Sequence, residues 1–309
     1  MSTDAKPTNL LEAIRYFSDL DVANEFVAKL RWPQGPVCPR CGSVEKHSYL
    51  TTRRIWKCRD CKKQFSVKLG TIFEDSPLGL DKWLPAVWLT ANSKNGISSH
   101  ELGRALGVTQ KSAWFMLHRI RLAMQTGSFD KLDGEVEVDE TYIGGLARNM
   151  HKHVRKQKIT GTGGVNKSTV LGIRKRDGEI RAAVVETTRK ADLFPHIHKH
   201  VEKGARVYTD TLPTYRSLGA DYEHETVDHA GKYVDGRVHT NGLENFWALL
   251  KRGLHGTYVS VEPFHLFRYL DERVFTYNLR ELSDLGRFAA VLSACAGRRL
   301  TYEELTGKA

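Results

Sequence analysis

The stretch of sequence that decides the fold is Glu135-Val-Glu-Val-Asp139-Glu-Thr-Tyr-Ile143. Its residues alternate with the two-residue period of a β-strand, so Glu135, Glu137 and Asp139 share one face. Repeated acids are poor material for an apolar core, and carboxylates are the groups with which an enzyme binds hard metal ions. Asp139 is therefore the first candidate ligand, and Glu137 is its main rival on geometry.

The segments that follow this strand predict a mixed α/β sheet. Their hydrophobic periodicity changes several times between that of a strand and that of a helix. The expected elements, in chain order, are strands at 169–173 and 180–185, a helix at 191–203, a strand at 205–209, a short helix around Tyr215, a strand at 223–227 and a helix at 241–252. Strands that come first, with helices between the later strands, indicate an α/β fold.

The second candidate acid is Asp210, at the carboxyl end of the strand Arg206-Val-Tyr-Thr-Asp210. In α/β folds, functional side chains are typically exposed where strands end. The alternative is that Asp210 only caps the turn after the strand.

The third candidate acid is Glu244, in the segment His239-Thr-Asn-Gly-Leu-Glu244-Asn-Phe-Trp. Thr240 or Asn241 can cap a helix that carries Glu244 in its first turns. Lys251 follows seven residues later, and it returns to nearly the same azimuth because one turn takes 3.6 residues. A solvated helix surface is the alternative for both charges.

Two close pairs of cysteines near the amino terminus predict a zinc site. Cys38 and Cys41 are separated by sixteen residues from Cys58 and Cys61, a spacing that lets four thiolates surround one Zn²⁺. Four thiolates leave no open coordination position, so the metal is expected to be structural and to supply folding energy. The fifth cysteine, Cys295, is expected to be a small core residue.

A helical module is expected between residues 80 and 124. Ser98 can begin one helix, Gly107 can end it and Thr109 can cap the next. This order is that of a helix-turn-helix, and a plain helical hairpin is the alternative. The residues of the second helix expected to lie away from its core, on faces available to DNA, are Gln110, Lys111, Ser112, Phe115, His118 and Arg119.

The charge balance favours a polyanionic partner. The chain has 47 Lys and Arg against 36 Asp and Glu, and its isoelectric point is near 9.4. The excess is local, because residues 38–68 hold nine basic residues and only two acids. Residues Arg148 to Lys158 hold five basic residues and no acid, as expected of a segment that contacts phosphates. The basic side chains expected to project from the cysteine-rich segment are Arg53, Arg54, Lys57, Lys62 and Lys63.

The sequence contains no secretory signal pattern and no apolar run long enough to span a membrane. The cysteine usage fits a reducing compartment better than a disulfide framework. A soluble cytoplasmic protein, associated with the nucleoid when bound to DNA, is the expectation.

Most of the chain resembles bacterial insertion-sequence transposases with an amino-terminal zinc ribbon, a group related to eukaryotic Merlin elements. The resemblance is specific because several motifs occur together in one order. They are the two cysteine knuckles, Phe65-Ser-Val-Lys-Leu-Gly-Thr-Ile-Phe73, Val138-Asp-Glu-Thr-Tyr-Ile-Gly-Gly145, Val207-Tyr-Thr-Asp210, His239-Thr-Asn-Gly-Leu-Glu-Asn-Phe-Trp247 and Leu250-Lys-Arg-Gly253.

The resemblance implies a ribonuclease-H-like catalytic domain with Asp139, Asp210 and Glu244 as ligands of Mg²⁺ or Mn²⁺. Lys251 would then contact a phosphate of the DNA. Related proteins can have another residue in place of the third acid, so Asn241 remains an alternative, as does the neighbouring Asn245. The implied partners are the DNA ends of the element, the target DNA and a second copy of the chain, because two ends are cut together.

Five segments are expected along the chain, with a boundary near 126–130 where Gly127 interrupts the helical pattern. The last segment is expected to pack against the catalytic domain. The segments are an amino-terminal helical segment at 1–30, the zinc ribbon at 31–68, the helix-turn-helix module at 69–127, the catalytic domain at 128–283 and a helix with a tail at 284–309.

Two other functions are compatible with this organisation. A zinc-ribbon regulator that binds DNA without catalysis would not need the three acids as a set. A ribonuclease-H-like nuclease would need them but would produce no joined DNA strands.

Overall fold

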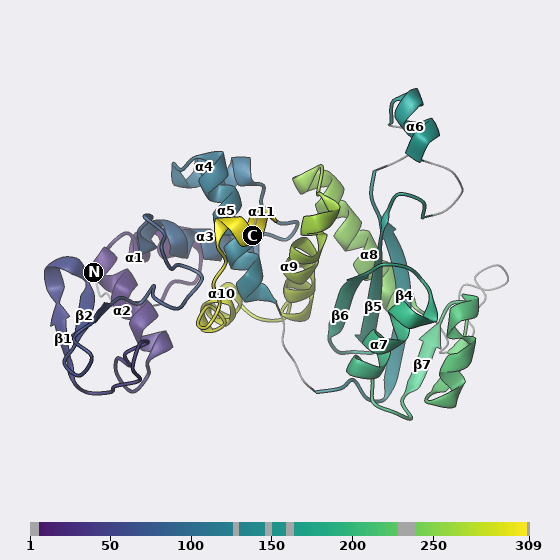
Figure 1. Ribbon diagram of the computed structural model, residues 1–309, viewed down its shortest axis with the longest axis horizontal. Helices are drawn as coiled ribbons and strands as arrows, with labels where there is room; N and C mark the ends of the chain where they lie inside the picture. Colours follow the sequence, from purple (N-terminus) through teal and green to yellow (C-terminus); the bar gives the residue numbers. More distant parts are fainter. Residues whose placement is uncertain (1–5, 126–129, 146–149, 159–163, 228–238, 308–309) are drawn as a thin grey trace. The chain divides into compact units, whose positions relative to one another are not determined.

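The computed structural model describes residues 6–125, 130–145, 150–158, 164–227 and 239–307 (Figure 1). The chain divides into two compact units. Unit 1 combines Met1–Gln125 with Leu279–Ala309, and unit 2 is Thr126–Asn278. The boundary expected near 126–130 falls largely on residues outside the described part.

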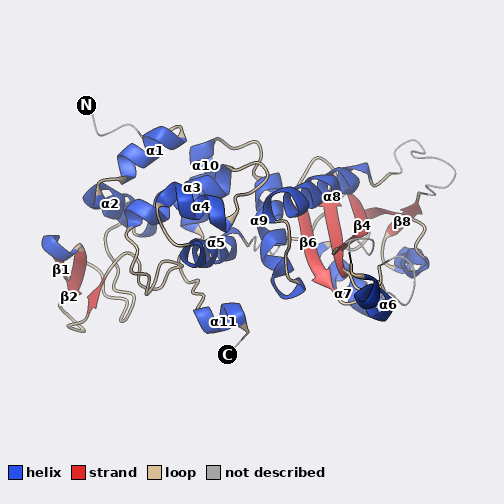
Figure 2. Cartoon of the chain, turned by 90° about the horizontal axis from the view of Figure 1, so that it is seen from above, coloured by secondary structure: helices blue, strands red, loops and turns tan. Residues whose placement is uncertain are grey.

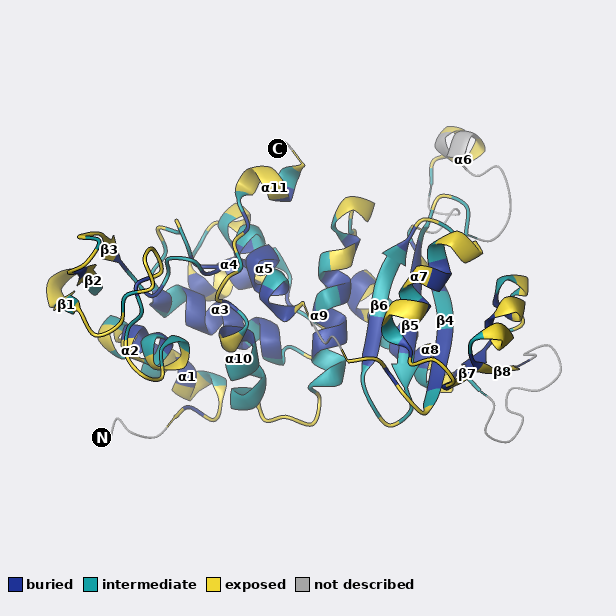
Figure 3. Ribbon diagram, turned by 60° about the horizontal axis from the view of Figure 1, so that its bottom comes forward, coloured by how far each residue is buried: buried dark blue, intermediate teal, exposed yellow. Residues whose placement is uncertain are grey.

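Unit 1 is a helical bundle that carries a small β-ribbon (Figure 3, where its central helices are dark blue). Its core contains large aromatic side chains, and the ring of Phe288 lies 5.5 Å from that of Phe17 and 5.1 Å from that of Trp88. The helices of the bundle are α1 (Leu10–Phe17), α2 (Leu20–Arg31), α3 (Leu80–Asn92), α4 (Ser99–Leu106), α5 (Gln110–Met124), α10 (Asp284–Ser293) and α11 (Tyr302–Thr306).

The carboxyl-terminal segment belongs to unit 1, and its expected packing against the catalytic domain is wrong. Helix α10 places Phe288 between Phe17 and Trp88, and this burial of aromatic surface holds it on α1 and α3. Beyond α10, the backbone pairs with the loop after the ribbon, since Gly297 N–H donates to the Gly70 carbonyl at 2.9 Å. Cys295 is buried there, as expected of a core residue.

The ribbon consists of strands β1 (His47–Leu50), β2 (Ile55–Cys58) and β3 (Gln64–Phe65) in one antiparallel sheet. Leu50 pairs with Ile55 across a tight connection formed by η1 (Thr51–Arg53). The Trp56 ring stacks on the Phe65 ring at 5.8 Å, so the ribbon has a small aromatic core.

Helices α4 and α5 follow one another with the expected turn at Gly107 between them. The Ser98 hydroxyl accepts from the Glu101 N–H at 3.2 Å, and Thr109 accepts in the same way from the Ser112 N–H at 3.1 Å. Gly107 ends α4 in the left-handed region with φ 63°, a conformation that favours glycine. The local signals in the sequence therefore predicted the limits of both helices.

The carboxyl-terminal half of α5 is not available to DNA, contrary to the expectation for His118 and Arg119. Arg119 is only 5 % exposed, and its guanidinium donates to the carbonyls of Ile72, Glu74 and Leu300 at 2.7–3.1 Å. His118 is buried as well. Gln110 and Lys111, in the first turn of α5, are exposed, so the surface available on this helix is its amino-terminal end.

Unit 2 is built on a five-stranded mixed sheet in the order β6-β5-β4-β7-β8. Strand β5 runs antiparallel to β4 and β6, whereas β4, β7 and β8 run parallel to one another. The mixed sheet confirms the predicted fold class and fits a ribonuclease-H-like domain. The strands are β4 (Glu135–Ile143), β5 (Ser168–Lys175), β6 (Ile180–Val185), β7 (Arg206–Thr209) and β8 (Glu223–Thr226).

Helices cover both faces of this sheet (Figure 2). One apolar cluster joins the sheet to α7 (Lys190–His200) and η3 (Pro213–Ala220). A second cluster on the opposite face joins it to α8 (Asn241–Gly253) and α9 (Leu266–Asn278). The shorter elements are α6 (Lys152–Lys158), η4 (Leu254–Tyr258) and η5 (Pro263–His265).

Within the residues that the structure describes, the helices are too short or too polar to cross a membrane.

Arg119→Ala is expected to lower the free energy of unfolding by about 2–4 kcal/mol, because it removes the donor shared by three backbone carbonyls. Urea denaturation followed by circular dichroism measures the change. Arg104→Ala, at an exposed position of α4, is the control and should stay within about 0.5 kcal/mol of wild type. Equal stability of the two variants would contradict the structural role of Arg119.

Candidate functional site

Asp139 lies on β4, and Asp210 directly follows the neighbouring parallel strand β7. The register of β4 and β7 pairs Glu135 with Arg206 and Glu137 with Tyr208. Continued for two residues beyond the paired positions, this register would set Asp139 opposite Asp210, which directly follows β7, and the charge of Asp210 does act on Asp139. Paired residues of adjacent strands project to the same face, so the register brings the first two candidate acids together.

The charges of three carboxylates interact at this position. Burial, together with the negative charges of Asp210 and Glu244, raises the pKa of Asp139 to about 6, although the hydrogen bond from Trp247 acts in the opposite direction. Among the described residues, these three carboxylates do not all lie within 4.8 Å of one another. Crowded acids of this kind are stabilised by a cation, and carboxylate oxygens are the preferred ligands of Mg²⁺.

Trp247 connects helix α8 to Asp139. Its indole N–H donates to Asp139 Oδ2 at 2.8 Å. Gly172 pairs with Asp139 across β4 and β5, and a Cβ at this glycine would lie 2.5 Å from the Trp247 ring. The absence of a side chain at Gly172 therefore lets the indole reach Asp139, a contact that the sequence pattern does not predict.

Glu137, the rival candidate, is engaged elsewhere. Its side chain is fully buried, and Arg174 Nη1 donates to its Oε1 at 3.1 Å. Its Oε2 accepts from the Leu243 backbone N–H at 3.0 Å. Because the charge of Glu137 is paired inside the protein, Asp139 is the better candidate for binding a metal.

Asp210 does cap the turn that follows its strand. The Leu212 N–H donates to Asp210 Oδ1 at 3.0 Å. This bond fixes the carboxylate but uses one of its oxygens, so capping and metal binding are compatible.

Glu140 is a further acid close to the site, on the other face of β4. Its Oε2 accepts from the Tyr215 hydroxyl at 2.7 Å. Burial, together with the charges of Asp210 and Asp139, raises the pKa of Glu140 to about 7, although the hydrogen bond from Tyr215 acts in the opposite direction. The sequence gives no signal for this pair, because Tyr215 meets Glu140 only through the sheet order.

Helix α8 presents Glu244 and Lys251 as its sequence predicts. The helix spans Asn241–Gly253, and Glu244 lies exposed in its first turn. Lys251 is half-buried near the end of the helix. Leu243, Phe246, Trp247 and Leu250 are buried and hold the adjacent side of α8 on the sheet. The alternative residues Asn241 and Asn245 are exposed.

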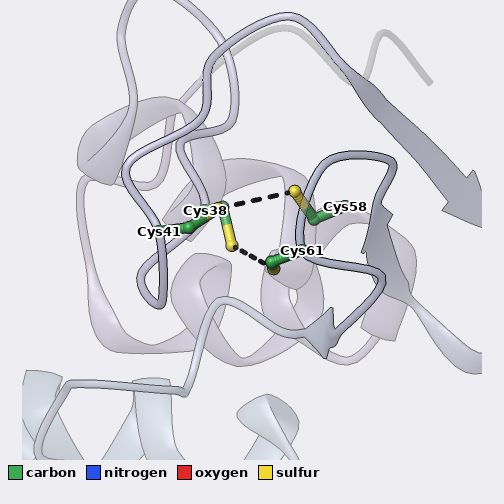
Figure 4. A group of neighbouring side chains, drawn as sticks. All are labelled: Cys38, Cys41, Cys58 and Cys61. Carbon is green, nitrogen blue, oxygen red and sulfur yellow. Dashed lines mark hydrogen bonds between the residues drawn. The ribbon is translucent and has the colours of Figure 1, made fainter.

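The four cysteines form one compact group, as predicted (Figure 4). The sulfurs of Cys38 and Cys61 are 3.7 Å apart, and those of Cys41 and Cys58 are also 3.7 Å apart. In a tetrahedron with Zn–S bonds of about 2.3 Å, two sulfurs would be separated by about 3.8 Å. The donors therefore fit a structural Zn²⁺.

The backbone of each cysteine pair forms the same tight turn. The N–H of Cys38 donates to the Ser43 carbonyl, and the N–H of Cys58 donates to the Lys63 carbonyl, both at 2.9 Å. The residue after each second cysteine has positive φ, 73° at Gly42 and 62° at Lys62. Backbone N–H groups of Cys61 and Asp60 lower the pKa of the Cys58 thiol to about 6, which favours the thiolate that a zinc site needs.

Most of the predicted basic surface of the ribbon is exposed. Arg54 is the exception, since its Nε is 2.6 Å from Asp21 Oδ1 on α2. The other four predicted basic side chains are exposed, namely Arg53, Lys57, Lys62 and Lys63.

The basic segment from Arg148 to Lys158 lies partly outside the described residues. Within the described part, α6 exposes Lys152, Arg155 and Lys156.

Two family models match the chain. Residues 131–278 match the ISXO2-like transposase domain, and residues 19–64 match the transposase zinc-ribbon domain. Together they cover more than half of the sequence. The chain carries an ISXO2-like transposase domain preceded by a transposase zinc ribbon. The ribbon match includes α2, which the cysteine spacing alone does not connect to the ribbon.

A relative supports this assignment. An uncharacterized protein in transposable element ISH50 of Halobacterium salinarum is 28% identical over 251 residues. The similarity covers 77% of this transposase and 84% of that protein.

Removal of zinc is expected to unfold residues 38–65, because the aromatic core of the ribbon is too small to be stable alone. Cys41→Ser should lose the single bound zinc and expose the ribbon to proteolysis. Metal analysis and mapping of the protease cuts measure both effects. Cys295→Ser is the matched control and should keep its zinc. Full zinc content in Cys41→Ser would contradict the proposed ligand set.

Asp139→Asn is expected to stabilise the metal-free catalytic site at alkaline pH. The folded-state pKa of about 6 lies above the ordinary value of 3.8, so the wild type loses stability as the pH rises through about 6. The variant should exceed wild type by on the order of 1–2 kcal/mol at pH 8 and by less at pH 5. Denaturation with zinc present and magnesium omitted tests this. Asp133→Asn, at an exposed position, should show no such gain.

Proposed function

We propose that this transposase cleaves DNA at the ends of its insertion sequence and joins them to target DNA. The proposal depends on one observation, the charge of Asp210, which directly follows β7, acting on the Asp139 carboxylate that Trp247 of α8 contacts. Glu244 completes the set from the first turn of α8, where its charge acts on Asp139.

The three carboxylates would hold Mg²⁺ or Mn²⁺. A pair of such ions activates an attacking oxygen and stabilises the leaving oxygen of a phosphodiester. Trp247 orients the Asp139 carboxylate, and the Leu212 N–H orients that of Asp210, so both acids are held before metal arrives. Glu244 is exposed, and its side chain would turn toward the two aspartates when an ion binds.

Two displacements at phosphorus would account for the activity. In the first, water attacks a phosphodiester at the element end and releases a 3′ hydroxyl. In the second, this hydroxyl attacks a phosphodiester of the target and displaces a target 3′ oxygen. Neither step requires a covalent enzyme intermediate. Lys251, two turns from Glu244 on the same side of α8, would contact a phosphate and hold the DNA end.

DNA recognition is assigned to unit 1 and to α6. The exposed amino-terminal end of α5 offers Gln110 and Lys111 for contacts in a groove. The exposed lysines and arginines of the ribbon and of α6 would contact backbone phosphates and make binding dependent on salt. Cutting two ends together requires at least two copies of the chain.

Asp139→Asn, Asp210→Asn and Glu244→Gln should each reduce cleavage and strand transfer by about 10²–10³-fold or more, while binding to the element ends persists. Gel assays with end-labelled DNA and Mg²⁺ or Mn²⁺ measure cutting, joining and binding separately. Glu202→Gln, at an exposed acid of the same unit, is the control and should retain both activities.

Three outcomes distinguish the candidate functions. Cutting without joined products would support the nuclease. Binding without cutting in any metal would support the regulator and would refute the catalytic proposal. Full activity of any of the three variants would remove that residue from the ligand set.

A further inference from the structure

We infer that the buried Glu137–Arg174 ion pair is a positioning element that sets the place of α8, and therefore of Glu244, above the two aspartates. The inference rests on the proposed function. It assigns Glu137 a role in metal binding without making it a ligand.

Both carboxylate oxygens of Glu137 have partners within the protein. Arg174 Nη1 donates to Oε1 at 3.1 Å, and Arg176 Nε lies 3.5 Å from the same oxygen. Oε2 accepts from the Leu243 N–H at 3.0 Å. A fully buried carboxylate that is paired in this way has little freedom to move. Its bond to Leu243 therefore fixes the position of the first turn of α8 relative to β4.

The contact with Leu243 lies in the first turn of α8. Thr240, at the N-cap of α8, makes no side-chain cap, and the Leu243 N–H donates both to the Thr240 carbonyl at 3.0 Å and to Glu137. Glu137 accepts from the third residue of the helix in place of a local cap, and its negative charge suits the helix terminus. Glu244 is the next residue, so any displacement of this turn also displaces the third acid.

Close approach of the helix to the ion pair requires glycine at position 242. A Cβ on Gly242 would lie 2.7 Å from Glu137 Oε2 and closer still to the Arg174 guanidinium. Arg174 is the register partner of Glu137 across β4 and β5, so the sheet itself places the pair under the helix.

Arg176 fixes the segment that leads into α8. Its Nη2 donates to the His239 carbonyl at 3.0 Å, and its guanidinium lies 4.2 Å from the centre of the Tyr208 ring. Two contacts therefore hold the start of α8. One joins Glu137 to Leu243, and the other joins Arg176 to His239.

Glu137→Gln tests the inference in the full-length chain with zinc retained. Glutamine keeps an oxygen for the Leu243 N–H but loses the charge that pairs with Arg174. The expected result is a Mn²⁺ affinity about tenfold weaker, measured by electron paramagnetic resonance without DNA, and DNA cleavage reduced about tenfold. The number of bound Mn²⁺ ions should not change, and raising Mn²⁺ should restore part of the activity.

Glu135→Gln is the matched control. Glu135 lies on the same face of β4, accepts from the Tyr208 hydroxyl at 2.8 Å and lies 3.7 Å from Arg176, so Glu135→Gln changes a charge of the same strand and keeps the bond between Glu137 and Leu243. This variant should change Mn²⁺ affinity by less than about twofold.

Gly242→Ala perturbs the same contact from the helix side and leaves every charge in place. It should weaken Mn²⁺ binding as Glu137→Gln does, whereas Gly219→Ala, which has open space around its Cβ, should not. The second pair of variants keeps the inference testable if Glu137→Gln does not fold.

Two results would overturn the inference alone while wild type binds Mn²⁺ and cleaves DNA. One is a loss of a bound Mn²⁺ ion in Glu137→Gln, which would make Glu137 a ligand. The other is wild-type affinity in both Glu137→Gln and Gly242→Ala. Failure of wild type to bind Mn²⁺ and to cleave would overturn the proposed function and the inference together.

Discussion

The contact between the first two turns of α8 and strand β4 is the constraint on which the catalytic face depends. One turn is held by the Leu243 N–H on Glu137, and the next by the Trp247 indole on Asp139. Two glycines allow this approach. A side chain at Gly242 would collide with Glu137 and Arg174 at the first contact, and one at Gly172 would collide with Trp247 at the second. Because an acid of the sheet accepts each of these bonds, the same strand both carries a proposed ligand and positions the helix that carries another.

The site combines acids with opposite environments. The charge of Glu137 is neutralised by arginines, whereas burial and neighbouring carboxylates raise the pKa of Asp139 and of Glu140. Such crowding costs stability when the site is empty, and a divalent cation would relieve it. The end of β4 that carries Asp139 and Glu140 therefore has the character expected of a functional site rather than of a surface shaped for stability alone.

The sequence predicted features that depend on local physics. Strand β4 has the predicted limits because its period of two is strong, and the limits of α4 and α5 follow from caps at Ser98 and Thr109. The cysteine group follows from spacing. The pairs Glu137–Arg174 and Trp247–Asp139 could not be predicted, because they depend on strand order and register. For the same reason, the packing of α10 beside Phe17 and the burial of Arg119 have no signal in the local pattern.

The central claim is that Asp139, Asp210 and Glu244 bind catalytic metal ions. Anomalous diffraction at the manganese edge, from crystals of the transposase with a DNA end and Mn²⁺, tests it most directly. The account predicts manganese bonded to Asp139 and Asp210, with Glu244 turned toward it, and a separate zinc signal at the four cysteines. Manganese bonded to Glu137, or ordered end DNA without manganese at Asp139 and Asp210, would contradict the account.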